Sequence, residues 1–177
     1  MMLTKEKQQT AFDALASDFG YKNRLQTPRI EKVVVSSGTG KHKDKGRNEM
    51  VVARLAKITG QKASPRPARM SIASFKMREG DIVGFQTTLR GARMFDFLDK
   101  LIHIALPRTR DFRGIALTAV DDMGNLTVGI REHTIFPETA DEDLKDVFGL
   151  AVTIVTTAKS KKEAEAFFTH LGVPFKK

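Results

Sequence analysis

The sequence predicts a single α+β domain of 177 residues, in which helices pack on one face of an antiparallel sheet and the other face stays open and polar. Hydrophobic residues make up 41% of the chain, enough for one core, and no internal repeat or long linker divides it. Short helical and strand patterns alternate along the chain. In the strand patterns apolar residues alternate with small polar or basic ones, whereas strands covered on both faces form continuous apolar runs.

The first third of the chain predicts two helices and a strand. Residues 4–18 carry apolar side chains at helical spacing, and Gly20 favours a helix end behind them. Residues 29–36 alternate as a strand. Residues 47–59 predict a second helix, which ends at Gly60.

The same patterns predict the remaining elements. They are an exposed basic loop at 61–81, a strand at 83–90, a helix at 92–106, strands at 115–120 and 126–133 joined by a turn at 121–125, a strand at 150–157, and a last helix between Ser160 and Gly172. Ser160 with Glu163, and Thr139 with Glu142, match the capping box, so a helix is expected to begin at each pair.

The polar sheet face is the first feature that bears on function. Thr88 and Arg90 lie on the polar side of their strand pattern, and Ser36 and Lys32 lie on that of theirs. Short hydroxyl and amide groups on a rigid sheet suit recognition of RNA by its shape and 2′-hydroxyls. An ordinary solvated sheet face is the alternative.

Charge is the second feature. The net charge is +9, and residues 41–78 alone hold eleven basic and two acidic residues, which is also +9. A basic segment on a neutral body predicts a local docking surface for a polyanion, although a solvated charged face remains the alternative. The candidate phosphate contacts are Lys41, Lys43, Lys45, Arg47, Arg54, Lys57, Lys62 and Arg66. Of these, Arg47, Arg54 and Lys57 form a stripe beside the apolar face of the helix at 47–59, where a ligand can reach them.

Other classes of function are disfavoured. No apolar run approaches the ~20 residues that a membrane span needs, and the polar N-terminus signals no secretion, so we expect a cytoplasmic protein. The chain has no Cys and its four His are dispersed, so we expect no metal and no cofactor. The turn at 37–41 lacks the spacing of a phosphate loop, and we expect a flexible turn whose N–H groups face phosphate. A nucleotide-dependent or RNA-modifying enzyme using this turn, and a general RNA chaperone, stay as alternatives.

Several motifs together resemble the bacterial-type family of large-subunit ribosomal protein L5. They occupy residues 72–80, 88–91, 107–114, 129–132 and 135–138, and residues 153–159 and 175–177 add to them. They run in order from about residue 22 to the C-terminus. The resemblance implies a non-catalytic protein that binds 5S rRNA and 23S rRNA in the central protuberance of the large subunit, beside neighbouring large-subunit proteins.

The resemblance also implies roles for particular residues. The 5S rRNA contacts carry over as Gln61, Phe75 and Thr88, joined by the polar-face residues Ser36, Lys32 and Arg90. Ser36 stands where the family usually has Asn, and its single hydroxyl has a shorter reach. Phe75 either stacks on a base or packs into the core.

Two further partners follow from the resemblance. The family's protruding loop toward the peptidyl-site tRNA matches residues 69–81, with Arg69, Lys76 and Arg78 on phosphates. Its bridge to a small-subunit head protein matches residues 108–113 and 137–146. The bridge candidates are Arg108, Arg110, Arg113, Glu138, Asp141 and Asp143. Capping of a helix start explains the acidic group more simply than acid/base catalysis does, and an acidic patch facing a basic head protein is a better reason for it than capping alone.

Overall fold

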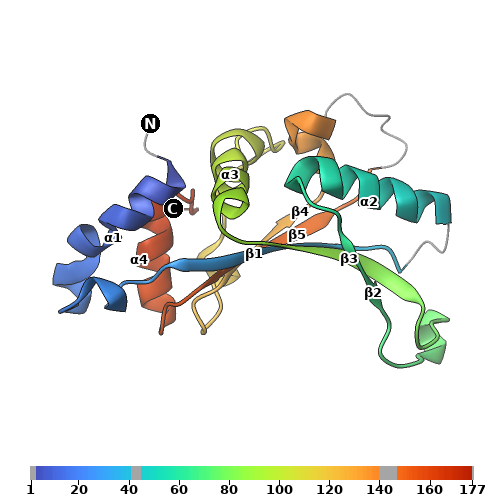
Figure 1. The fold of residues 1–177 in the computed structure, drawn as a ribbon, viewed down its shortest axis with the longest axis horizontal. Coiled ribbons are helices and arrows are strands. Elements are labelled where there is room, and N and C mark those ends of the chain that lie inside the picture. The colour runs from blue at the N-terminus through green and yellow to red at the C-terminus, as the bar shows by residue number, and fades with distance from the viewer. Residues whose placement is uncertain (1–2, 41–44, 140–146, 177) are drawn as a thin grey trace. The chain divides into compact units, whose positions relative to one another are not determined.

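A computed structural model describes residues 3–40, 45–139 and 147–176, and the backbone alone at Lys45. These described residues form four α-helices and a five-stranded antiparallel sheet with strand order β2-β3-β1-β5-β4 (Figure 1). The helices are α1 (Thr4–Phe19), α2 (Lys45–Thr59), α3 (Ala92–Lys100) and α4 (Lys161–Leu171). The strands are β1 (Ile30–Gly38), β2 (Ser64–Pro67), β3 (Ile82–Leu89), β4 (Leu126–Ile130) and β5 (Leu150–Thr156). The predicted α+β class is confirmed.

The chain divides into two compact units. The first unit comprises Met1–Val33, Leu89–Val128 and Thr153–Lys177, and the second comprises Val34–Thr88 and Gly129–Val152. The strands β1, β3, β4 and β5 contribute residues to both units. That the chain acts as one domain stays a prediction.

In the first unit α1 packs against α4 and α3. The Asp99 carboxylate of α3 accepts the backbone N–H of Thr4 at 2.7 Å, which satisfies an otherwise unpaired donor at the start of α1. Phe167 and Phe168 of α4 are fully buried. As predicted, α1 ends at Gly20, where φ is +65° and glycine meets no steric penalty.

The helix predicted at 92–106 has its expected extent but changes type near its end. After α3, Leu101–Ala105 form a π-helix, and the N–H of Leu106 donates to the carbonyl of Leu101 at 2.9 Å. On this segment the Nε2 of His103 is buried and has no hydrogen-bond partner among the described residues.

In the second unit, the prediction of a loop throughout 61–81 is wrong, because Ser64–Pro67 form β2. This strand pairs antiparallel with β3, Ser64 opposite Gln86 and Arg66 opposite Gly84, with an irregularity before Pro67. It lies at the edge of the sheet. Proline lacks an N–H, and an edge strand tolerates it because one side of the strand needs no partner.

The prediction of a strand at 115–120 is also wrong. Ile115 pairs with Phe175 and Val120 with Leu126, but both are isolated bridges, and Leu117–Ala119 form a 3-10 turn. With backbone partners only at its two ends, the segment cannot form a continuous ladder. The following strand is shorter than predicted and stops at Ile130.

The predicted turn at 121–125 is confirmed. The Asp121 carboxylate accepts the backbone N–H of Asn125 at 2.6 Å and its side-chain amide at 3.0 Å. Slight burial acts to raise the pKa of Asp121, but these bonds and one from the Met123 backbone outweigh it and hold the pKa below its usual value. Among the helices that the structure describes, none is long and apolar enough to cross a membrane.

Candidate nucleic-acid interface

The strands of the second unit have one covered face and one open face. On β1 and β3 the buried side chains include Val35, Phe85 and Thr87. Ser36, which follows Val35, and Thr88, which follows Thr87, are half-buried. The predicted alternation is therefore confirmed. Glycine at position 84 has a local reason: a Cβ there would stand 2.8 Å from the backbone carbonyl oxygen of Ser37, so β1 and β3 approach too closely for any side chain.

Gln61 and Thr88 are brought together although 27 positions separate them in the chain. α2 ends at Thr59, whose hydroxyl donates to the carbonyl of Leu55 at 2.7 Å, and Gly60 reverses the chain with φ at +67°. This reversal turns Gln61 toward β3, where its Nε2 donates to the carbonyl of Thr88 at 3.4 Å. The amide and the Thr88 position thus form one small polar group.

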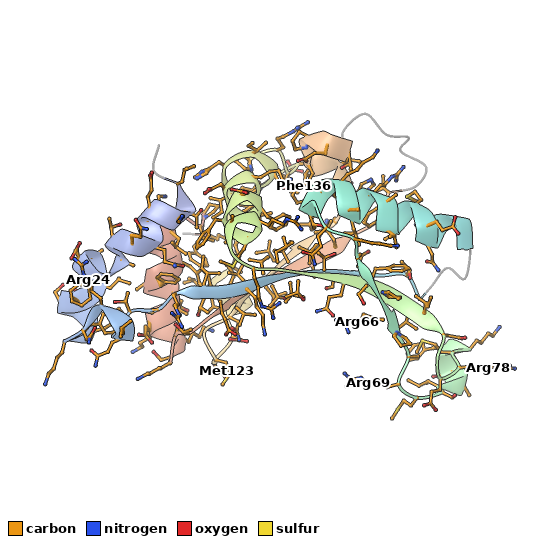
Figure 2. All side chains as sticks on the ribbon, in the orientation of Figure 1. Arg24, Arg66, Arg69, Arg78, Met123 and Phe136 are labelled. Atoms are coloured by element: carbon orange, nitrogen blue, oxygen red, sulfur yellow. The ribbon has the colours of Figure 1, made fainter. Side chains whose placement is uncertain are left out.

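The loop at 69–81 is built by its own backbone. Ile72 and Met77 exchange N–H···O bonds of 3.0 and 3.2 Å, and Ala68 donates to Asp81 at 2.8 Å. Figure 2 shows Arg69 and Arg78 on this loop, beyond the ends of β2 and β3. A loop already ordered in this way loses less conformational entropy when it binds a partner.

Apolar side chains stand out from the same loop. Phe75 is 72% exposed and Met70 is 66% exposed, and the basic residues Arg69, Lys76 and Arg78 are exposed around them. The possibility that Phe75 packs into the core is therefore wrong. An exposed ring among cations is the arrangement that stacks on bases while the cations meet phosphates.

The stripe predicted on α2 is interrupted at Arg54. This side chain is only 8% exposed, and its Nη1 lies 3.3 Å from Nε2 of the buried His133. The His133 ring stacks on Phe148 at 4.2 Å between ring centroids. The prediction that Arg54 lies open to a ligand is wrong, because the guanidinium serves the interior of the unit.

The other predicted phosphate contacts differ in accessibility. Arg47 is half-buried and donates to the carbonyl of Val147 at 3.4 Å, whereas Lys57, Lys62 and Arg66 are exposed. Lys41, Lys43 and the side chain of Lys45 lie outside the described residues.

The prediction of a flexible turn at 37–41 is wrong at Ser37 and Gly38, because these residues belong to β1. The N–H of Thr39 donates to the carbonyl of Val83 at 2.9 Å, so this N–H is not available to a phosphate. The Thr39 hydroxyl is buried without a partner among the described residues.

The remaining predicted residues fall in several places. In the first unit, Lys32 is half-buried and Arg90 is exposed. Arg108, Arg110 and Arg113 are exposed on a loop whose far end is anchored where Ile115 donates to the carbonyl of Pro174 at 2.8 Å. In the second unit Glu138 is exposed. Asp141 and Asp143 lie outside the described residues, as does most of the helix expected after Thr139.

Sequence reasoning missed His133, the residue that turns Arg54 inward. Its signal was weak, because it is one of four dispersed histidines and lies just past a strand. Only the folded unit places it beside a helix 79 positions earlier in the chain.

A polar sheet face, an ordered cationic loop and an exposed aromatic ring define a protein that binds nucleic acid through a preformed surface. Comparison with known proteins agrees. Residues 23–78 match the family model of ribosomal protein L5, and residues 82–175 match the model of the C-terminus of the same family. The chain belongs to the ribosomal protein L5 family.

Individual relatives are similar over nearly their whole lengths. "Large ribosomal subunit protein uL5" of Flavobacterium johnsoniae is 46% identical over 176 residues, covering 99% of this chain and 96% of the relative. The proteins of the same name from Anaeromyxobacter sp. (strain K) and Trichlorobacter lovleyi are 46% and 47% identical over 163 residues, covering 92% of this chain and 91% of each relative.

Proposed function

We propose that this chain binds 5S rRNA with the open sheet face of its second unit and attaches it to 23S rRNA in the central protuberance. Its family is one of ribosomal proteins and not of enzymes, and its relatives are proteins of the large ribosomal subunit. Binding to rRNA and a place in the large subunit of the cytoplasmic ribosome follow from that membership. The choice of 5S rRNA and the residues that contact it are the proposal.

The observation that carries the proposal is that the Gln61 amide, just past the end of α2, donates to the backbone carbonyl of Thr88 on β3. A hydrogen bond already orients the Gln61 amide. Ribose and phosphate oxygens can therefore be met without ordering long side chains, which keeps the entropy cost of binding low. Phe75 and the exposed Lys62 and Arg66 supply stacking and charge within the same unit.

The ordered loop at 69–81 contacts the peptidyl-site tRNA in this proposal. Arg69, Lys76 and Arg78 meet backbone phosphates, and this contact is independent of sequence because phosphates are the same in every tRNA. The support is the loop's own hydrogen bonding and the exposure of its cations.

The exposed arginines Arg108, Arg110 and Arg113 form part of a bridge to the small-subunit head, together with Glu138 and the acidic segment that follows it. Individual exposed ion pairs contribute about 0–1 kcal/mol. Such weak pairs let a bridge break and reform when the subunits move.

Two substitutions test the sheet face. Thr88→Val removes a hydroxyl while keeping the shape, and Gln61→Ala removes the amide. Each is expected to raise the Kd for 5S rRNA about fivefold, since one net hydrogen bond contributes about 1 kcal/mol. Filter binding across a salt series measures the affinity, which should fall steeply with salt because phosphate contacts release counterions.

Thr118→Val is the matched control, because Thr118 is an exposed residue outside the proposed surface. It should bind 5S rRNA like the wild type. Wild-type binding by both Thr88→Val and Gln61→Ala, or a flat salt response, would contradict the proposal. Equal affinity for unrelated RNAs would favour the RNA-chaperone alternative instead.

A further inference from the structure

The first unit contains a hollow that no predicted contact uses. It has a volume of about 450 Å³ and lies between α1 and the segment that leads into β1, lined among others by Gln8, Gln9, Phe12, Arg24 and Arg29. This volume is within the usual range for small-ligand sites, about 300–1,000 Å³. We infer that this hollow receives a single unpaired nucleotide of ribosomal RNA. The inference rests on the proposed RNA binding but concerns a separate surface.

Arg24 provides a platform for a base. Its guanidinium lies over the ring of Phe12, 5.9 Å from the ring centroid, and Figure 2 shows it beside α1. The 3-10 turn Arg24–Gln26 holds it there, since the Asn23 side chain accepts the N–H of Leu25 at 3.0 Å. Unstacked bases stack on arginine planes as well as on aromatic rings, and Arg24 is exposed.

Two glutamines supply polar groups at the edge of the hollow. The Oε1 of Gln8 accepts the N–H of Ile30 at 2.9 Å, which fixes the orientation of its amide and leaves the NH₂ as a donor. Gln9 is exposed. An amide offers a donor and an acceptor to the hydrogen-bonding edge of a base, whereas an acidic peptide would need donors alone.

Basic residues gather beside the hollow, and the first unit as a whole is basic, with 17 Lys and Arg against 11 Asp and Glu. The backbones of Arg29 and Thr157 are linked, since Thr157 donates to the carbonyl of Arg29 at 3.0 Å and its hydroxyl accepts the N–H of Arg29 at 3.1 Å. This link brings Thr157, at the start of the segment 157–162, against Arg29 in the segment 21–32. Together the two segments carry seven basic residues and one acidic residue, Glu31. The next acid, Glu163, is buried and accepts the N–H of Lys159 at 2.7 Å.

Charge and shape together favour a nucleotide. Arg29 and the lysines at 159, 161 and 162 suit the phosphates on either side of one base, and Arg24 with the glutamines suits the base itself. Leu25, which is 86% exposed beside the hollow, adds an apolar surface for the ribose or the base.

The test uses the full chain with 5S rRNA and 23S rRNA as separate probes in filter binding over a KCl series. Arg29→Gln should weaken binding to at least one of them about three- to tenfold and reduce the slope of log K against log salt by about 0.7, the value for one single-stranded phosphate contact. Gln9→Ala should weaken the same binding several-fold without changing the slope, because a base contact carries no counterion. Arg93→Gln, an exposed arginine on α3, is the charge-matched control and should change neither quantity.

Wild-type affinity and slope for Arg29→Gln on both RNAs would overturn the inference. A second result would also overturn the inference: the wild-type protein binds polyglutamate, Arg29→Gln abolishes that binding, and neither RNA competes with it. The hollow would then be a peptide site. Thr88→Val measured in parallel reports on the sheet face alone. Failure of the hollow and failure of the proposed 5S rRNA surface are therefore distinguishable.

Discussion

Arg54 and Arg66 allow one substitution to be compared at a buried and an exposed site of the same unit. Arg54→Gln and Arg66→Gln each remove one positive charge. Arg54 lies 3.3 Å from the fully buried Nε2 of His133, whereas Arg66 is exposed on the edge strand β2. Glutamine is too short to reach His133 from position 54. Arg54→Gln therefore leaves a buried nitrogen without this partner, and Arg66→Gln does not.

The expected stability loss follows from the contact. A hydrogen bond to a charged group contributes about 1.5–3 kcal/mol, so Arg54→Gln should cost about 2–3 kcal/mol. In a chain of this size that corresponds to a fall in Tm of about 5–10 °C. Arg66→Gln should stay within about 0.5 kcal/mol of the wild type. Thermal unfolding followed by circular dichroism measures both.

RNA binding should show the opposite pattern. Arg66→Gln should reduce the salt slope for 5S rRNA by about 0.7–0.9, and Arg54→Gln, measured well below its Tm, should leave the slope unchanged. A stable Arg54→Gln protein with a reduced slope would refute the assignment of Arg54 to the interior.

Two other predictions concern stability. Tyr21 is the only tyrosine and the chain has no Trp, so its phenolate absorbance is isolated, and burial together with the bond it donates to Glu163 raises its pKa above the ordinary value. Because the pKa of Tyr21 is raised in the folded state, the stability that its contact with Glu163 contributes is full below about pH 10 and is lost as the pH rises above it. An absorbance titration should show ionisation of Tyr21 only above about pH 10, and Glu163→Gln should lower its pKa. An ordinary pKa in the wild type would contradict the contact. Gly84→Ala should lower the free energy of unfolding by about 1–3 kcal/mol, because its Cβ would stand 2.8 Å from the Ser37 carbonyl oxygen. Gly129→Ala is the control: its Cβ meets nothing within 4 Å, so its stability should be close to that of the wild type. Equal Tm values for the two variants would show that β1 and β3 do not approach so closely.

Much of the fold was predictable because its signals are local. The helix ends at Gly20, Gly60 and Gly172 depend on the conformational freedom of one residue, and each forms where expected. In β3, β4 and β5 the alternation of apolar and polar residues can be seen in neighbouring positions of the sequence, and the buried positions match it. Segments that depend on distant partners were predicted less well. β2 forms because an edge of β3 accepts it, and 115–120 fails as a strand because only its two ends find partners.

The candidate site divides in the same way. The sequence by itself determined the family, the polar residues of the sheet face and the basic segment at 41–78, since all of these are properties of residue order and composition. Only the tertiary structure decided which of those cations remain available. It turned Arg54 inward to His133, left Arg66 exposed, and joined Arg29 to Thr157, which precedes the lysines at 159, 161 and 162. The physical reason is that burial and the partners of a charge depend on contacts between residues far apart in the chain, which no local pattern records.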